Sequence, residues 1–142
     1  MTTRELLNQY PQATLYSIDV NPRVVDHVRY NFAREIDQGR LKVMEGDGYF
    51  ARQLFPKTDF QAILMMNNIT FMADRIPDSH LEFITSQVDA VLEDQGYLFF
   101  SANREHAILK KQEGKYRVER HRSYLKEREI TRLIESFTSM RE

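Results

Sequence analysis

Two acidic residues stand at matching places, each directly after a segment with the composition of a β-strand. Asp19 follows residues 14–18, and Asp47 lies in the turn after residues 41–44. An ionised carboxylate offers two acceptor oxygens in one plane, so Asp19 can accept two hydrogen bonds from a ribose diol. Asp47 can accept a hydrogen bond from an exocyclic amine. In the alternative interpretation both acids only cap helices or stabilise turns, as aspartate often does.

The residues between these two segments predict a helix. Asn21 is suited to the N-cap and Pro22 to the first helical position, and Gly39 can take the left-handed conformation that ends a helix. Apolar residues recur along one face: Val24, Val25, Val28, Phe32 and Ile36. In such a β-α-β unit the strands are parallel, and their carboxyl ends open on one edge of the sheet. Ligands of open α/β sheets bind at that edge.

The remaining sequence predicts further helices and strands around this unit. Ser79 and Glu82 have the spacing of a capping box, Gly96 is expected to close the helix that they begin, and residues 110–115 are expected to form a charged loop. The other expected elements are a short helix at residues 4–10 capped by Thr2 or Thr3, a helical turn within residues 49–55, a buried strand at Phe60–Met66, the buried stripe Leu81, Ile84, Val88, Val91 and Leu92 of the long helix, a buried strand at residues 97–101, an edge strand or extended arm at residues 116–124, and a last helix marked by Ile130, Leu133, Ile134 and Phe137.

Length and composition indicate one globular domain over residues 1–142, with residues 116–142 forming its edge strand and terminal helix. The chain has no cysteine, which excludes disulfides, thiolate metal sites and a cysteine nucleophile. The four histidines show no metal-ligand spacing, so no metal site is expected. No apolar run suits a signal peptide or a membrane span, and we expect a cytoplasmic protein that does not bind membranes.

The balance of 20 basic and 21 acidic residues, with a formal charge of −1, argues against a nucleic-acid partner. One local cluster of basic and aromatic residues departs from this balance. We interpret it as a solvated edge strand in preference to a surface for an acidic substrate or RNA phosphate. Its members are Tyr116, Arg117, Arg120, His121, Arg122 and Tyr124.

The order of these features resembles the class I S-adenosylmethionine-dependent methyltransferases over residues 5–137. Residues 6–13 look like the end of that family's first helix, residues 16–22 like its second strand and acidic turn, Gly46-Asp47-Gly48 like the turn after its third strand, Phe60–Met66 like its fourth strand, and residues 91–101 like its helix, Pro-Gly-Gly-like turn and fifth strand. The resemblance implies a three-layer, Rossmann-like α/β fold with a mostly parallel sheet, and S-adenosylmethionine as the cofactor.

The resemblance also implies a role for particular residues in binding that cofactor. Asp19 would hold the ribose hydroxyls, Val20 would pack on the adenine, and Asp47 would meet the adenine amine. Gly48 would supply backbone at close approach, while Met66 and Asn67 would flank the methionine part. No general base is assigned, because an activated sulfonium needs mainly in-line positioning of donor and acceptor. The methyl acceptor is not identified.

The sequence departs from the family at its start. The family has a first strand ending in a glycine-rich turn, whereas the first glycine of this chain is Gly39. The missing strand leaves a gap between residues 15–18 and Phe60–Met66, which must pair directly or be separated by another segment. A truncated product, an incomplete gene model and a degenerate homologue all fit this pattern.

Two other functions stay open at this point. The acidic turns also resemble the polyamine aminopropyltransferases, which place an acidic base just after the fourth strand. Met66, Asn67 and Asn68 stand there instead, and an amide cannot take a proton from an amine. The second alternative is a non-catalytic interaction module, forming a homodimer that hides its open sheet edges.

Overall fold

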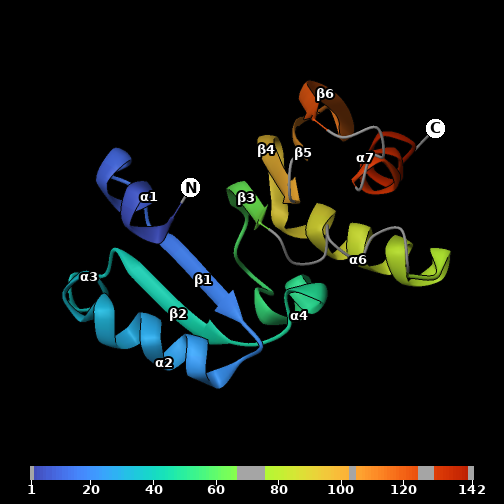
Figure 1. Ribbon diagram of the computed structural model, residues 1–142. Helices are drawn as coiled ribbons and strands as arrows, with labels where there is room; N and C mark the ends of the chain where they lie inside the picture. The colour runs from blue at the N-terminus through green and yellow to red at the C-terminus, as the bar shows by residue number, and fades with distance from the viewer. Residues whose placement is uncertain (1, 67–75, 103–104, 125–129, 141–142) are drawn as a thin grey trace. The chain divides into compact units, whose positions relative to one another are not determined.

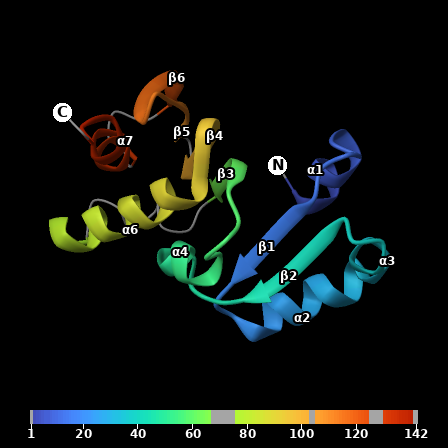
Figure 2. The same ribbon diagram turned by 180° about the vertical axis from the view of Figure 1, so that it is seen from behind.

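The structure is a computed structural model that describes residues 2–66, 76–102, 105–124 and 130–140 (Figures 1 and 2). The chain divides into two compact units, Met1–Gly48 and Tyr49–Glu142, and each is described by itself. That the whole chain forms one domain stays a prediction. In the described part of the chain, no helix has the length and apolar character needed to cross a membrane.

The first unit is a β-α-β arrangement preceded by a short helix. Its two strands are parallel, with Leu15 opposite Leu41 and Asp19 opposite Glu45, which confirms the predicted crossover. The arrowheads of both strands point the same way in Figure 1, and α2 runs along the pair. The elements are α1 (Thr3–Gln9), β1 (Leu15–Asp19), α2 (Pro22–Asn31), α3 (Ala33–Asp37) and β2 (Leu41–Glu45).

The ends of the crossover helix are fixed by the predicted residues. The Asn21 side-chain oxygen accepts a hydrogen bond from the backbone N–H of Arg23 at 3.0 Å, and Pro22 opens α2. Gly39 has φ 75°, and its N–H donates to the carbonyl of Ile36 at 3.0 Å. Because a left-handed residue at this place redirects the backbone, the last helical carbonyls find partners and β2 can begin.

The crossover differs from the prediction in two respects. It is two helices, because the helix stops at Phe32 and restarts at Ala33. Val24 was expected on the buried face but is 40% exposed, whereas Val25 is 2% exposed. Val24 lies in the first turn of α2, at the end of the sheet, where the strands beneath it stop.

Helix α1 is tied to the rest of the first unit by polar contacts. The predicted cap is Thr2, whose hydroxyl accepts from the N–H of Glu5 at 3.2 Å. The Arg4 guanidinium lies 2.6 Å from the Glu35 carboxylate on α3, and this contact holds the pKa of Glu35 below its usual value. Arg40 donates to the carbonyl of Leu7.

The second unit is a mixed four-stranded sheet in the order β3-β4-β5-β6, with α6 and α7 packed on it (Figures 1 and 2). Strands β3 and β4 are parallel, and the other neighbours are antiparallel. The elements are η1 (Gly48–Phe50), α4 (Ala51–Leu54), β3 (Phe60–Met66), α6 (Asp78–Val91), β4 (Leu92–Ala102), β5 (Glu105–Gln112), β6 (Lys115–Ser123) and α7 (Thr131–Thr138). Their core includes Met65, Leu81, Ile84, Val88, Leu98, Phe100, Leu109, Leu133 and Phe137.

The predicted start of α6 is wrong. The helix begins at Asp78, and Pro77 occupies the N-cap with extended backbone and no side-chain cap. Ser79 therefore lies inside the first turn and forms no capping box. The carbonyl of Pro77 accepts from Leu81 at 3.1 Å, so the backbone alone closes this turn.

The predicted end of α6 at Gly96 is also wrong. The helix ends at Val91 and β4 starts at the next residue. Gly96 lies in a bulge of β4, since Phe60 pairs with Leu92 but Ala62 pairs with Tyr97. A Cβ at Gly96 would be 2.7 Å from the Leu92 side chain and 2.8 Å from the backbone oxygen of Glu93. Glycine is needed here because the bulge folds tightly on itself.

The charged loop expected at residues 110–115 is a hairpin. Strand β5 continues to Gln112 and β6 begins at Lys115, so only Glu113 and Gly114 form the turn. Both have positive φ, 54° and 77°, as two-residue hairpin turns require. The edge strand expected at residues 116–124 is confirmed as β6.

The sequence predicted that the first strand and Phe60–Met66 either pair directly or are separated by another segment, and the strand pairing bears on the first of these alternatives. Strand β1 belongs to one sheet and β3 to another, so the two do not pair directly within the described residues. Among the residues that the structure describes, β1 pairs with β2 alone and β3 with β4 alone.

Candidate functional site

The carboxyl edge of the β1–β2 pair brings two turns together. Asp19 and Glu45 are the last paired residues, and the N–H of Gly46 donates to the carbonyl of Asp19 at 3.0 Å. The turn that carries Val20 therefore lies beside the turn that carries Asp47. Four of the six predicted site residues share this edge: Asp19, Val20, Asp47 and Gly48.

The carboxylate of Asp19 is oriented by the chain itself. One oxygen, Oδ1, accepts from the backbone N–H of Asn21 at 2.8 Å, and the residue is half-buried. The other oxygen accepts no hydrogen bond from the described residues. Asp19 therefore stabilises a turn, as the alternative interpretation had it, and also keeps an acceptor for a ligand.

Val20 gives this edge an apolar surface. Its side chain is 65% exposed, next in sequence to Asp19, and Val24 on the first turn of α2 is 40% exposed. A small exposed apolar surface beside an oriented acceptor suits a flat heterocycle attached to a hydroxylated sugar. Exposure of single apolar residues is common, so Val20 indicates a binding surface only because it adjoins the oriented carboxylate of Asp19.

Gly48 has no structural need to be glycine. Its φ is not positive, and a Cβ built there meets no atom within 4 Å. The backbone at Gly48 is exposed, and a ligand can approach it without meeting a side chain. Asp47, the preceding residue, is half-buried.

The last two predicted site residues belong to the second unit or lie outside the described residues, so their place at this edge stays a prediction. Met66 is the final residue of β3 in the second unit, and Asn67 lies outside the described residues. A depression with a volume of about 440 Å³ lies on the first unit just before β1, at the end of that strand opposite to Asp19. Its lining, residues 9–13, offers no charged group.

Comparison with known proteins reveals similarity in structure only. No protein-family model matches the chain, and no curated protein matches it. A S-adenosylmethionine-dependent methyltransferase from Clostridium acetobutylicum aligns over 96% of this chain with 11% identity and a TM-score of 0.57. An O-methyltransferase family protein from Burkholderia thailandensis aligns over 68% with 16% identity and a TM-score of 0.52. The N-methyltransferase NodS from Bradyrhizobium japonicum aligns over 64% with 18% identity and a TM-score of 0.50.

The chain has a class I methyltransferase-like fold. It spans 65% of the Clostridium protein, 47% of NodS and 27% of the Burkholderia protein, which is less than two thirds of each. This confirms the predicted α/β, Rossmann-like fold class. The acidic edge of the first unit corresponds to where α/β folds bind ligands.

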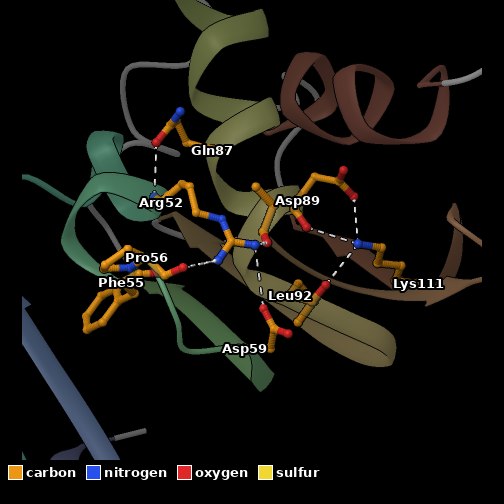
Figure 3. A network of polar contacts seen from close by, with 9 residues as sticks. Arg52, Phe55, Pro56, Asp59, Gln87, Asp89, Leu92 and Lys111 are labelled. Carbon is orange, nitrogen blue, oxygen red and sulfur yellow. Dashed lines mark hydrogen bonds and ion pairs between the residues drawn. The ribbon is translucent and has the colours of Figure 1, made fainter.

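The second unit of this methyltransferase-like fold contains a separate cluster of charged groups (Figure 3). The Arg52 guanidinium donates hydrogen bonds to backbone carbonyls, including those of Ala90 and Phe55. It also forms an ion pair with the Asp59 carboxylate at 3.6 Å. The backbone N–H of Arg52 donates to the side-chain oxygen of Gln87 at 3.0 Å. Arg52 thereby joins α4 to the end of α6.

Lys111 closes the same end of α6 from the sheet. Its ammonium donates to the carbonyls of Asp89 and Leu92 at 2.9 and 2.8 Å, and lies 3.0 Å from the Asp89 carboxylate. The Tyr116 hydroxyl donates to that carboxylate at 2.8 Å. A cation at a helix C-terminus is favourable, and each charge here has a protein partner, so the cluster is structural.

Proposed function

We propose that this protein binds S-adenosylmethionine at the carboxyl edge of β1–β2 and serves methyl transfer to an acceptor not yet identified. The observation that carries the proposal is the Asp19 carboxylate. It is held in place by the N–H of Asn21 and keeps a second oxygen for a ligand. Oriented acceptors of this kind bind a ribose diol at little cost in ordering.

The other edge residues fit the nucleoside. Val20 offers an exposed apolar surface for adenine, and Gly48 leaves its backbone open to close approach. Asp47 is proposed to accept from the adenine amine. When bound, the cofactor supplies an activated methyl group. The task of these residues is to fix its position for in-line transfer.

Met66 and Asn67 are proposed to flank the methionine part of the cofactor. The chain has no glycine-rich turn before Gly39, so the proposal rests on recognition of the nucleoside half. S-adenosylhomocysteine and 5′-methylthioadenosine are therefore expected to bind with affinities within about tenfold of each other, because they share that half. A much weaker 5′-methylthioadenosine would place the main contacts outside the β1–β2 edge.

The observation that favours a second candidate is the pairing of the strands. Strands β1 and β3 each pair on one side only within the described residues, and such edges attract further strands. A non-catalytic interaction module forming a dimer would use them. It differs from the enzyme in having no cofactor affinity to lose. Aminopropyl transfer gains no comparable support.

The test is isothermal titration calorimetry with S-adenosylmethionine and S-adenosylhomocysteine, run beside a size determination in solution. Asp19→Asn is the informative variant, because its amide oxygen can still accept from Asn21 while the charge is lost. Hydrogen bonds to a charged group contribute about 1.5–3 kcal/mol, so affinity should fall about 10- to 100-fold.

Asp37→Asn is the matched control. Asp37 is exposed at the end of α3, and this variant removes the same charge without touching the edge. Its affinity should equal that of the wild type. Absence of saturable binding by folded wild-type protein, or equal losses in the two variants, would contradict the proposal.

A further inference from the structure

The four-stranded sheet of the second unit has one covered and one open face. Helices α6 and α7 lie on one face of the sheet (Figures 1 and 2). Leu98, Phe100, Ala107 and Leu109 are buried in one core cluster together with residues of these two helices. Residues at the alternate positions of β4, β5 and β6 point the other way. No helix among the described residues of this unit covers that second face.

The strand register arranges the open face in cross-strand rows. Tyr97, Lys110 and Arg117 form one row, since Tyr97 pairs with Lys110 and Lys110 with Arg117. The next row is Phe99, Ile108 and Arg120, and the third is Ser101, His106 and Arg122. Aromatic rings therefore lie along β4 and guanidinium groups along β6.

The open face carries an exposed aromatic ring and exposed basic groups. Tyr97 is 39% exposed, and the Lys110 ammonium lies 5.5 Å from the centre of its ring. Glu119 forms an ion pair with Arg117 at 2.7 Å. Arg120 and Arg122 are exposed and have no acidic partner among the described residues.

The other basic and aromatic residues of the predicted cluster lie differently. His121 is on the covered face, 2.7 Å from the Glu105 carboxylate. Tyr116 is 6% exposed and packs on Phe137. Arg117 and Arg120 thus share cross-strand rows with Tyr97 and Phe99 on β4, with one β5 residue between them, an arrangement that the sheet register reveals.

We propose that the open face of the β3–β6 sheet binds single-stranded RNA. Bases stack on Tyr97 and Phe99, as single strands do on aromatic side chains, while Arg120 and Arg122 contact phosphates. Strands β4 and β6 are two strand spacings apart, about 9–10 Å, which is of the same order as the reach from a base to its phosphate. His106, in the third row, can bond the 2′-hydroxyl that distinguishes RNA from DNA.

Charge decides between this occupant and a covering helix or second copy. An apolar partner would remove Arg120 and Arg122 from water without a compensating charge, which is costly. A phosphate backbone supplies that charge. The overall charge of −1 does not oppose this, because Glu119 is paired with Arg117 while the exposed Arg120 and Arg122 form a local basic surface.

The test measures fluorescence anisotropy of a labelled 12-nucleotide oligouridine with the full 142-residue chain at several salt concentrations. The double variant Arg120→Gln/Arg122→Gln removes two phosphate contacts. At about 0.7 per contact on a single strand, the slope of log affinity against log salt should fall by about 1.4. Arg29→Gln/Arg34→Gln on α2 and α3 removes the same charge elsewhere and should leave the slope unchanged.

A second variant tests stacking. Tyr97→Leu keeps an apolar side chain but removes the ring, and affinity should fall about 5- to 20-fold, with circular dichroism confirming the fold. Equal losses in the two arginine variants, or equal affinity for the matching deoxyribonucleotide strand, would overturn the proposal. So would a dimer that Tyr97→Leu dissociates and that binds no RNA. None of these readouts depends on S-adenosylmethionine.

Discussion

The described part of the chain contains two β-α-β units, in which the helix is joined to the second strand in different ways. Between β1 and β2, the helix ends at a left-handed glycine, Gly39, and a short link leads into the strand. Between β3 and β4, α6 ends at Val91 and the strand starts at the next residue. The extra residues of β4 form the bulge before Tyr97.

Packing differs as much as connection. Among the described residues of the first unit, the buried apolar side chains are Leu7, Val25 and Leu41. The second unit has a continuous core from Met65 to Phe137. Local hydrogen bonds and caps therefore hold the first unit, whereas apolar burial holds the second. The candidate cofactor edge belongs to the unit with the smaller core.

Truncation of the core of the second unit should have the largest effect. Phe137 is fully buried, with its ring centre 5.6 Å from that of Phe100 and 5.1 Å from that of Tyr116. Phe137→Ala should lower the free energy of unfolding by about 3–5 kcal/mol in urea denaturation. Tyr30→Ala, at an 86% exposed site on α2, should change it by less than about 0.5 kcal/mol. Similar effects in both variants would remove the contrast between the units.

Gly96 and Gly48 differ in whether the fold leaves room for a side chain. Gly96→Ala brings a Cβ against Leu92 and the backbone of Glu93, and should cost about 1–3 kcal/mol of unfolding free energy. Gly48→Ala meets no protein atom within 4 Å and should be neutral within about 0.5 kcal/mol. Both are measured by urea denaturation. A destabilised Gly48→Ala would mean that glycine is needed there for the fold.

Loss of a cap should have a smaller effect, in the first unit. Asn21→Ala removes the acceptor for the N–H of Arg23 and should cost about 1 kcal/mol. Thermal denaturation followed by circular dichroism measures it. Asn8→Ala, at an exposed position inside α1, should not destabilise, because alanine favours helix. An unchanged melting temperature for Asn21→Ala would show that water replaces the cap.

The smallest effect is a shift in one titration. Arg4→Gln removes the guanidinium that lowers the pKa of Glu35, so that pKa should rise toward 4.5 in an NMR titration of the side-chain carboxyl. In the wild type a lowered folded pKa gives stability that is complete above the unfolded value and is lost as pH falls through the folded one. In the variant this loss should be smaller, because the backbone hydrogen bond and Arg34 still lower the pKa of Glu35.

The control for this titration lies in the second unit. The backbone N–H of Gly114 lowers the pKa of Asp94, and Arg4→Gln should not change it. A shift of both groups would show that the substitution acts on the whole chain.

Signals within a few residues were sufficient to predict much of the fold. Asn21-Pro22 and Gly39 fixed the ends of the crossover, and the mainly apolar run at Phe60–Met66 predicted the bounds of β3. The edge that carries Asp19 followed from these, because a parallel pair brings both strand ends together. The expected burial of β3 was wrong in part, because Gln61 and Ala62 are exposed. The glycine at 48 was predicted from resemblance, and the structure adds that packing does not require it.

Features that depend on distant partners were not predictable. Helix α6 stops at Val91 because Leu92 pairs with Phe60, a partner 32 positions earlier by residue number. Strand β5 has few β-branched residues and is a strand because β4 and β6 flank it. Arg52 donates to the carbonyl of Ala90, 38 positions away, and Lys111 to that of Asp89, 22 positions away. Local sequence patterns do not predict such contacts.

The direct junction of α6 and β4 constrains how the length of this chain can change. One residue inserted between Val91 and Leu92 turns the helix by about 100° relative to the strand, or shifts the strand by one pairing position. The first outcome exposes the buried stripe of α6, and the second moves Leu98 and Phe100 to the opposite face of the sheet. Insertions and deletions in descendants of this gene should accumulate at the Glu113–Gly114 turn and avoid this peptide bond.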